Sequence, residues 1–231
     1  MELSIILPTF NEGQNLAILI DKIKEIFERS VYDYEIIVVD AGSTDNTFKI
    51  AKEKGVRVFI QEHPGYGGAL HDAIKSARGK FIITLDADLS HNPYIIKRLF
   101  SKRHSAHIVI ASRYVKGGLA NMPLSRRILS MVLNRFLCFA LSLPLRDISS
   151  GFRLYNAEIF NEIDFSERNF NVLVEILVKA YMNGFKVKEI PFHYQPRSKG
   201  KSHAKIINFG LGFLRTFIKL WKIRNTIASA D

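Results

Sequence analysis

The sequence predicts an α/β protein with a mostly parallel sheet and helices on both of its faces. Two observations lead to this fold class. Across residues 1–115, short β-branched apolar runs alternate with segments whose apolar residues recur three and four positions apart. The chain also shows no internal repeat and no Pro/Ser-rich linker, which favours one compact domain over 1–205 with an extension over 206–231. Such a rhythm is typical of parallel strands joined by crossover helices.

The first two strands follow directly from composition. Residues 4–7 (SIIL) form a short apolar run that Pro8 closes, and residues 34–40 (YEIIVVD) form a β-branched run that ends on an acid. Between them, apolar residues at helical spacing from Leu16 to Phe27 predict an amphipathic helix.

Further elements continue the alternation up to residue 115. A turn at 42–44 offers helix-cap candidates, and the helix after it is expected to end near Gly55. We expect a helix over 65–78 and strands over 56–61, 80–86 and 108–112. Ligands bind outside the carboxyl ends of the strands in such sheets. Six polar residues fall at these ends: Asn11, Glu12, Asp40, Asp86, Asp88 and Arg113.

The second half of the chain has longer apolar helices. Residues 124–143 predict a long apolar helix that contains Arg126, Arg127 and Arg135. Further elements are a helix over 171–181, a short strand over 185–191, a basic loop over 197–205 and an amphipathic basic helix over 206–223.

Composition excludes several classes of protein. Apolar residues make up 47% and charged residues 24% of the 231 residues, which is a globular balance rather than that of a disordered chain. The single cysteine, Cys138, excludes an internal disulfide framework and a cysteine-based zinc cluster, and favours a reducing compartment. It lies in an apolar helix and is interpreted as a packed core thiol. We expect no signal peptide, because the N-terminus lacks a basic segment and reaches Pro8 and polar residues early. We expect no transmembrane helix, because no run of 18 uncharged apolar residues occurs.

The charge is unevenly distributed. The formal net charge is +11, yet residues 1–60 carry 7 basic and 10 acidic groups while residues 171–231 carry 11 basic and 3 acidic groups. A basic C-terminal part indicates an anionic partner: a phosphate-bearing substrate, an anionic lipid surface or nucleic acid. A solvated basic face is the simpler interpretation and stays open.

The sharpest candidate site is Asp86-Ala87-Asp88. Two carboxylates one residue apart, directly after a buried strand, repel one another, and a divalent cation would relieve that repulsion. Hard oxygen ligands suit Mg²⁺ or Mn²⁺, which would complete its shell with diphosphate oxygens. The alternative is a strand-end turn in which one Asp caps the helix near residues 92–93.

Other polar residues have two interpretations each. Asp40 can accept hydrogen bonds from a base or ribose, or it can belong to an N-cap cluster with residues 43–45. Asp147 is a candidate acid/base or acceptor-side group and Arg153 a candidate anion clamp, unless Asp147 forms a salt bridge with Arg146 or Arg153. The glycines at 65–68 fit no phosphate-loop fingerprint, so a tight turn is the better interpretation.

Five motifs in order resemble a known family. They are SIILPTFNE, EIIVVDAGSTDNT, DADL, SRYVKGG and DISSGFR, and over residues 3–205 they resemble family 2 glycosyltransferases of the GT-A fold. Within that family the likeness is greatest to the dolichyl-phosphate mannose synthase group. The resemblance implies metal-dependent transfer of mannose from GDP-mannose to a polyprenyl phosphate, with inversion at the sugar.

The resemblance also implies roles for individual residues. Asp86 and Asp88 would flank a Mg²⁺ or Mn²⁺ ion, with Asp88 the main ligand and Ala87 beside the diphosphate. Catalysis would rest on Asp88 and Arg113, and on Asp147 if the acceptor is a hydroxyl. The donor would contact Pro8, Phe10, Glu12, Val39, Asp40, Asp86, Ala87, Arg197, Lys201, His203 and Lys205. The acceptor phosphate would contact Arg113, with Arg126, Arg127 and Arg153 as further candidates.

Four positions depart from the family pattern. Phe10 stands where Tyr is common, and Ala41 replaces a second acid, which weakens the expectation of guanine selectivity. Ser90 replaces a Gln, and His203 replaces a Lys whose charge Lys201 or Lys205 would supply. Many members also carry C-terminal transmembrane helices.

Alternative functions remain at this point. The nearest alternative is a sugar transferase with a hydroxyl acceptor, for example with a UDP-glucose donor, and another is a nucleotide-binding module without turnover. A nucleic-acid binder is disfavoured, because no recognition motif accompanies the charge. The helices over 124–143 and 206–223 predict a peripheral enzyme at the cytoplasmic face of the membrane, with a membrane-anchoring subunit as a candidate partner; packing of both helices against protein is the alternative.

Overall fold

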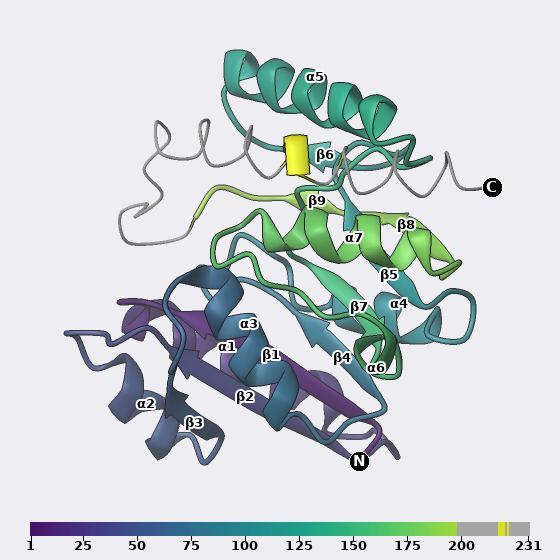
Figure 1. Cartoon of the computed structure of the whole chain (residues 1–231). Coiled ribbons are helices and arrows are strands. Elements are labelled where there is room, and N and C mark those ends of the chain that lie inside the picture. Colours follow the sequence, from purple (N-terminus) through teal and green to yellow (C-terminus); the bar gives the residue numbers. More distant parts are fainter. Residues whose placement is uncertain (198–216, 220, 222–231) are drawn as a thin grey trace.

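A computed structural model describes residues 1–197, 217–219 and 221 of the chain (Figure 1). Within these residues the main sheet has seven strands in the order β3-β2-β1-β4-β7-β5-β8, and a two-stranded sheet pairs β6 with β9. Strands β1 to β4 are mutually parallel, as are β5 and β8, whereas β7 runs antiparallel to both of its neighbours. The predicted mostly parallel sheet is therefore confirmed.

The elements follow the predicted order closely in the first half of the chain. The strands are β1 (Leu3–Thr9), β2 (Tyr34–Asp40), β3 (Arg57–Ile60), β4 (Phe81–Thr84), β5 (Ile108–Ser112), β6 (Leu119–Ala120), β7 (Arg153–Asn156), β8 (Val187–Pro191) and β9 (His193–Tyr194). The helices are α1 (Gly13–Phe27), α2 (Thr47–Glu53), α3 (Gly65–Ser76), α4 (Ile95–Ser101), α5 (Leu124–Ala140), α6 (Ile159–Glu162) and α7 (Val172–Met182).

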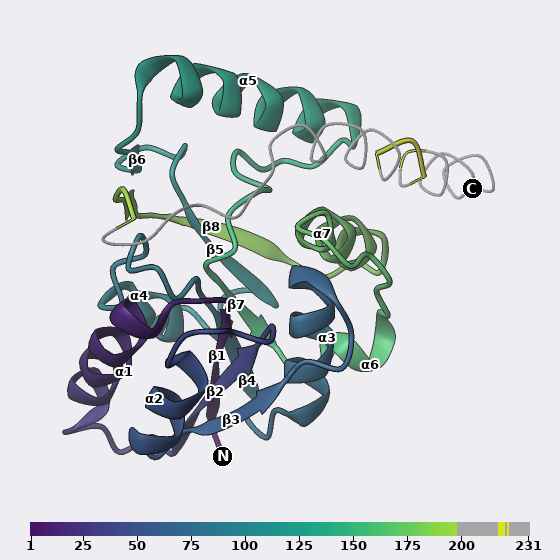
Figure 2. The same ribbon diagram turned by 90° about the vertical axis from the view of Figure 1, so that its left-hand side faces the viewer.

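Alternate side chains of each central strand enter two separate cores. In β2, Ile36 and Val38 face a core with α1, α2 and α4, whereas Ile37 and Val39 face a core with α3, α5 and α7. Figure 2 shows α1, α2 and α4 on one side of the sheet and α3, α6 and α7 on the other. The continuous apolar runs in the sequence follow from this arrangement, since both faces of these strands are covered.

Helix α5 differs from the others because most of its apolar side chains are exposed. Only Asn134, Leu137 and Cys138 of its residues are buried, and both views place the helix at the end of the molecule opposite the N-terminus (Figures 1 and 2). Burial raises the pKa of the Cys138 thiol to about 12, as expected for the packed core thiol predicted from sequence. None of the helices that the structure describes has both the length and the hydrophobicity needed to cross a bilayer.

Candidate active site

A cavity of about 400 Å³ opens at the carboxyl ends of β1, β2, β3 and β4. Each of these strands delivers its next residues to the rim, as parallel sheets of this type do. The lining residues are Pro8, Thr9, Phe10, Glu12, Ala41, Gln61, Gly65, Tyr66, Ala69, Asp86, Ala87, Asp88, Asn169, Phe170 and Arg197. Among them are the predicted metal ligand Asp88 and six of the predicted donor-site residues: Pro8, Phe10, Glu12, Asp86, Ala87 and Arg197.

The turns after β1 and β2 hold each other in place. Asn11 has a positive φ of 55°, and its side-chain oxygen accepts hydrogen bonds from the backbone nitrogens of Thr44 and Asp45. The Asp45 carboxylate in turn accepts from the backbone nitrogens of Gly13 and Thr47, at the start of α1 and α2. These contacts fix the first two rim segments relative to one another.

Asp40 supports this rim rather than lining the cavity. Its carboxylate is buried and accepts hydrogen bonds from the backbone nitrogen and hydroxyl of Ser43 and from the Thr9 hydroxyl. The next residue, Ala41, reaches the cavity instead. Val39 is fully buried in the core beneath the rim, so its side chain cannot contact a ligand. The expectation that these two side chains bind the donor directly is therefore corrected.

Asp86 and Asp88 both line the cavity, on the turn that follows β4. Burial raises the pKa of Asp86 and the nearby Asp88 carboxylate raises it further, whereas His91 and Arg197 oppose the shift. The backbone nitrogen of Asp86 donates to His91 Nδ1 at 3.2 Å, and one Asp88 oxygen accepts from the backbone nitrogen of Ser90 at 2.9 Å. Keeping both carboxylates ionised at this site costs free energy, and a bound divalent cation would remove that cost. The oxygens of Asp86 and Asp88 therefore fit such an ion as ligands.

Arg197 connects the two acidic parts of the rim. Its Nη1 lies 2.8 Å from Glu12 Oε1, and its Nε lies 3.3 Å from Asp88 Oδ2. The second Glu12 oxygen accepts from the Asn15 side chain at 2.7 Å. Arg197, which is 185 positions from Glu12 in the chain, thus lines the cavity beside the acid pair. A guanidinium in this position is suited to bind a phosphate.

Tyr66 and Phe170 form one wall of the cavity and were not predicted from the sequence. Their rings stack with centroids 4.3 Å apart and planes 16° apart. The Tyr66 hydroxyl is buried without a hydrogen-bond partner among the described residues. Burial raises its pKa, and the Asp86 charge adds to that shift, so the hydroxyl stays protonated and can donate to a ligand.

The glycines beside Tyr66 explain how this wall packs. A Cβ on Gly67 would lie 2.0 Å from the Glu167 carbonyl oxygen, and one on Gly68 would lie 2.0 Å from the His63 carbonyl oxygen. The backbone nitrogen of Gly67 donates to the Arg168 carbonyl at 2.7 Å. Gly67 therefore permits close backbone contact with the segment that carries Phe170, and Gly68 leaves room for the carbonyl that precedes α3. The Gly-rich pattern was the available signal, although it indicates packing and not phosphate binding.

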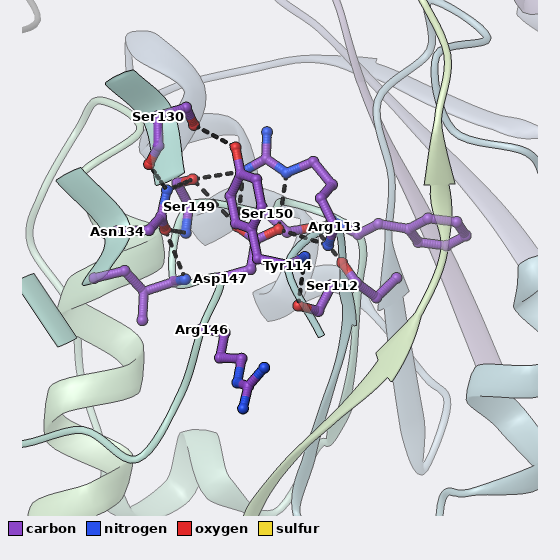
Figure 3. Close-up of polar contacts among 12 residues, drawn as sticks. Ser112, Arg113, Tyr114, Ser130, Asn134, Arg146, Asp147, Ser149 and Ser150 are labelled. Carbon is purple, nitrogen blue, oxygen red and sulfur yellow. Dashed lines mark hydrogen bonds and ion pairs between the residues drawn. The ribbon is translucent and has the colours of Figure 1, made fainter. Parts of the chain in front are cut away.

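A second group of polar residues surrounds Arg113, at the end of β5 (Figure 3). Arg113 donates through Nε and Nη2 to the two oxygens of Asp147, at 2.8 and 2.7 Å, and through Nη2 to Ser149 at 2.7 Å. Burial alone would raise the pKa of Asp147, but the Arg113 charge and hydrogen bonds outweigh it and lower that pKa. The salt bridge left open by the sequence exists, with Arg113 as the partner instead of Arg146 or Arg153. Asp147 therefore orients Arg113 and is not placed to act as a base.

Arg153 is a structural residue. It is fully buried, and its Nε, Nη1 and Nη2 donate to the carbonyls of Ser150, Leu173 and Ile148. A guanidinium engaged in this way cannot clamp the acceptor phosphate, so that prediction is wrong.

Arg126 and Arg127 lie on the first turn of α5 and are exposed. Burial raises the pKa of Tyr194, Asp88 raises it further, and Arg126 and Arg113 lower it. The charges of Arg113, Arg126 and the acid pair therefore all act on the Tyr194 hydroxyl. Lys201, His203 and Lys205 lie outside the described residues, as does most of the predicted helix over 206–223.

The profile of glycosyl transferase family 2 matches residues 4–164. The chain therefore belongs to glycosyl transferase family 2, the class of enzyme that its sheet and strand-end site define.

Curated relatives share much of the chain. A dolichol-phosphate mannosyltransferase of Pyrococcus furiosus is 33% identical over 89% of this chain, which spans 60% of that relative's length. A polyprenol monophosphomannose synthase of Mycolicibacterium smegmatis is 30% identical over 98% of this chain and 89% of its own length. A dolichyl-phosphate hexose transferase of Haloferax volcanii is 26% identical over 85% of this chain and 84% of its own.

Solved structures confirm the GT-A fold. Glucosyl-3-phosphoglycerate synthase of Mycobacterium tuberculosis, in complex with Mn²⁺, UDP and glucosyl-3-phosphoglycerate, superposes with a TM-score of 0.77 at 19% identity. The match covers 96% of this chain and 80% of that one. The same enzyme in complex with Mg²⁺ and UDP gives a TM-score of 0.74.

Proposed function

We propose that this protein transfers a hexose, mannose from GDP-mannose, to a polyprenyl phosphate, with Mg²⁺ or Mn²⁺ as cofactor. The observation that carries the proposal is the convergence of Glu12, Asp86, Asp88 and Arg197 on one strand-end cavity. The names of the curated relatives support the substrate class.

The cavity has suitable groups for a nucleotide sugar. Phe10 and the Tyr66–Phe170 pair supply aromatic faces for the base or the sugar. Asp86 and Asp88 would hold the divalent ion, which when bound neutralises charge on the leaving diphosphate. Arg197 would add a second positive charge on the same side and retain the donor while the anomeric bond breaks. Guanine remains the expected base from family likeness, although Ala41 offers no side-chain hydrogen bond to it.

The acceptor side favours a phosphate over a hydroxyl. A phosphate is already ionised near neutral pH, so it attacks without a general base, whereas a hydroxyl requires one. Asp147, the candidate base, is fully buried, and both of its oxygens are bound by Arg113. Arg113, Arg126 and Arg127 would instead attract the acceptor phosphate through their charge.

Helix α5 supports a peripheral location at the cytoplasmic face of the membrane. The helix carries the exposed Arg126 and Arg127. Eight of its apolar side chains are exposed: Leu124, Ile128, Leu129, Met131, Val132, Leu133, Phe136 and Phe139. An amphipathic basic helix of this kind binds at the level of lipid headgroups. A lipid-linked phosphate would then reach Arg113 while its tail stays in the bilayer. A separate anchoring subunit is compatible with the same surface.

Transfer from radiolabelled GDP-mannose to a short polyprenyl phosphate tests the proposal. We expect lipid-linked product that depends on Mg²⁺ or Mn²⁺, and a loss of about 100-fold or more in kcat for Asp88→Asn. The control is Asp21→Asn, which removes an exposed carboxylate paired with Lys54 and should leave transfer unchanged.

Two results would overturn the proposal. One is full activity of Asp88→Asn with metal dependence retained. The other is transfer to a soluble hydroxyl acceptor, with no product on the polyprenyl phosphate. UDP-glucose in place of GDP-mannose tests the donor separately: tight UDP binding without GDP binding would reverse the donor preference but not the acceptor class.

A further inference from the structure

We propose that His63, His71 and Asp72 form a second metal site, separate from the acid pair, that takes a borderline transition-metal ion such as Zn²⁺. His63 precedes α3, while His71 and Asp72 are neighbours on that helix. One ligand atom from each of the three side chains lies within 4.8 Å of the other two. None of the three lines the cavity that holds Asp86 and Asp88.

The Nδ1 atoms of His63 and His71 both face one oxygen of the Asp72 carboxylate. His63 Nδ1 lies 2.5 Å from Asp72 Oδ1, and His71 Nδ1 lies 3.4 Å from it. The two rings meet edge to face with centroids 4.9 Å apart. Ligand atoms around a tetrahedral zinc ion stand about 3.4 Å apart, given bonds of 2.0–2.2 Å. The His71–Asp72 distance already matches this value, and the His63–Asp72 distance must open by about 1 Å.

Backbone hydrogen bonds hold the Asp72 carboxylate in place. Its other oxygen, Oδ2, accepts from the backbone nitrogens of Glu62 and His63 at 2.7 and 3.0 Å. Oδ1 is thereby positioned to face the Nδ1 atoms of both histidines. Two imidazoles and one carboxylate are a donor set that Zn²⁺ accepts and that Mg²⁺ does not favour.

The surroundings leave room to complete the coordination shell. The His63 and His71 side chains are 37% and 39% exposed. His71 also lines a hollow of about 450 Å³ with Lys75, Asp164 and Phe165, so water can supply the remaining ligand.

Zinc titration of the full-length protein tests the site. Asp86→Asn and Asp88→Asn are first introduced together to remove the carboxylates of the acid pair. Any Zn²⁺ that still binds is then independent of the proposed catalytic metal site. Calorimetry with Zn²⁺ should detect one equivalent bound, and Co²⁺ should give the strong visible absorption of a four-coordinate ion with nitrogen ligands. We expect His71→Ala to weaken Zn²⁺ binding by more than about 10-fold and to abolish the Co²⁺ spectrum.

A matched control and a second variant keep the test decisive. His104→Ala removes another exposed histidine, which packs on Phe81, and should change neither signal. Circular dichroism establishes that His71→Ala is folded; if it is not, His63→Gln provides the same comparison. Unchanged stoichiometry and affinity in the folded histidine variants would overturn the proposal. It stands or falls independently of sugar transfer, because no transfer assay is used.

Discussion

Some residues of the site could be predicted from the sequence and others could not. Asp86, Asp88 and Glu12 follow strands that are evident from composition, so the topology rule places them at the rim. Tyr66 was missed because its position depends on contact between α3 and the segment around residues 167–170, which no local pattern encodes. Arg153 was misassigned for a related reason: an arginine near a site motif resembles an anion clamp until its three carbonyl partners are known.

The Tyr66 hydroxyl gives a prediction for the donor site. Tyr66→Phe keeps the stacked ring but removes the buried donor, so we expect kcat/KM for the nucleotide sugar to fall by about 3- to 10-fold. The free energy of unfolding should not decrease, since no partner of the hydroxyl is lost among the described residues. Tyr155→Phe is the matched control, because it removes a buried hydroxyl outside the cavity. Equal kinetics for Tyr66→Phe and wild type would contradict the prediction.

The Arg113–Asp147 pair predicts how stability depends on pH. The pKa of Asp147 is lowered in the folded protein, so its ionised form contributes stability above the unfolded pKa of about 3.9, which is lost as pH falls through the folded pKa. Asp147→Asn should cost about 3 kcal/mol at neutral pH and flatten the loss of stability below about pH 4. Urea unfolding across pH measures both effects. Asp21→Asn, which removes an exposed carboxylate paired with Lys54, is the control and should behave like wild type.

At the scale of elements, strand composition predicts the sheet better than it predicts the connections. The runs over 34–40 and 108–112 became β2 and β5 with the predicted bounds, because strands covered on both faces need continuous apolar sequence. Strand β7 was missed, since its RLYN sequence has only two large apolar residues and its pairing to β4 and β5 is non-local. The small β6–β9 sheet was missed for the same reason.

One buried polar side chain of helix α5, Asn134, links the helix to the loop beside Arg113. Asn134 donates to the Ser130 carbonyl and the Ser149 hydroxyl, and its oxygen accepts from the backbone nitrogens of Ile148 and Ser149 (Figure 3). The Tyr114 hydroxyl also bonds to Ser130 at 2.7 Å. The helix that carries Arg126 and Arg127 is thereby fixed to the loop that orients Arg113.

We expect Asn134→Ala to cost about 2–4 kcal/mol in the free energy of unfolding, because it leaves two backbone nitrogens without a partner. The variant should also raise KM for the lipid acceptor more than KM for the donor, since α5 carries Arg126 and Arg127, which are proposed to attract the acceptor phosphate. Asn183→Ala is the matched control: its side chain also bonds to the carbonyl four residues earlier, but it is exposed. Equal changes in both KM values would contradict the coupling of α5 to the acceptor side.

At the scale of the whole molecule, the exposed apolar surface of α5 is the feature that burial alone does not explain. Phe139 is 85% exposed and Leu124 is 68% exposed, on a helix that lies beyond the sheet. Exposed apolar side chains in such number on one helix are the basis of the membrane contact proposed above. The sequence left two placements open for this helix, at a membrane or packed against protein, because an apolar helix of this length can do either.

Flotation with anionic vesicles measures the proposed membrane contact. We expect binding at low salt that weakens at high salt, and each of Arg126→Gln and Arg127→Gln should lower the partition coefficient about fivefold. Phe139→Asp should reduce it further, whereas Val31→Asp, at a 93% exposed apolar residue far along the chain, should not. Full-length protein that remains with the soluble fraction at low salt would contradict a peripheral location.

The place of β7 in the sheet has a consequence for the nascent chain. β5 pairs only with β7 and β8 in the main sheet that the structure describes, and both are synthesised after it. While residues up to 152 emerge from the ribosome, β4 lacks its second neighbour and β5 lacks both. The half of the sheet that carries Arg113 therefore cannot assemble during most of translation, and its unpaired apolar strands are open to aggregation until residues 153–191 arrive.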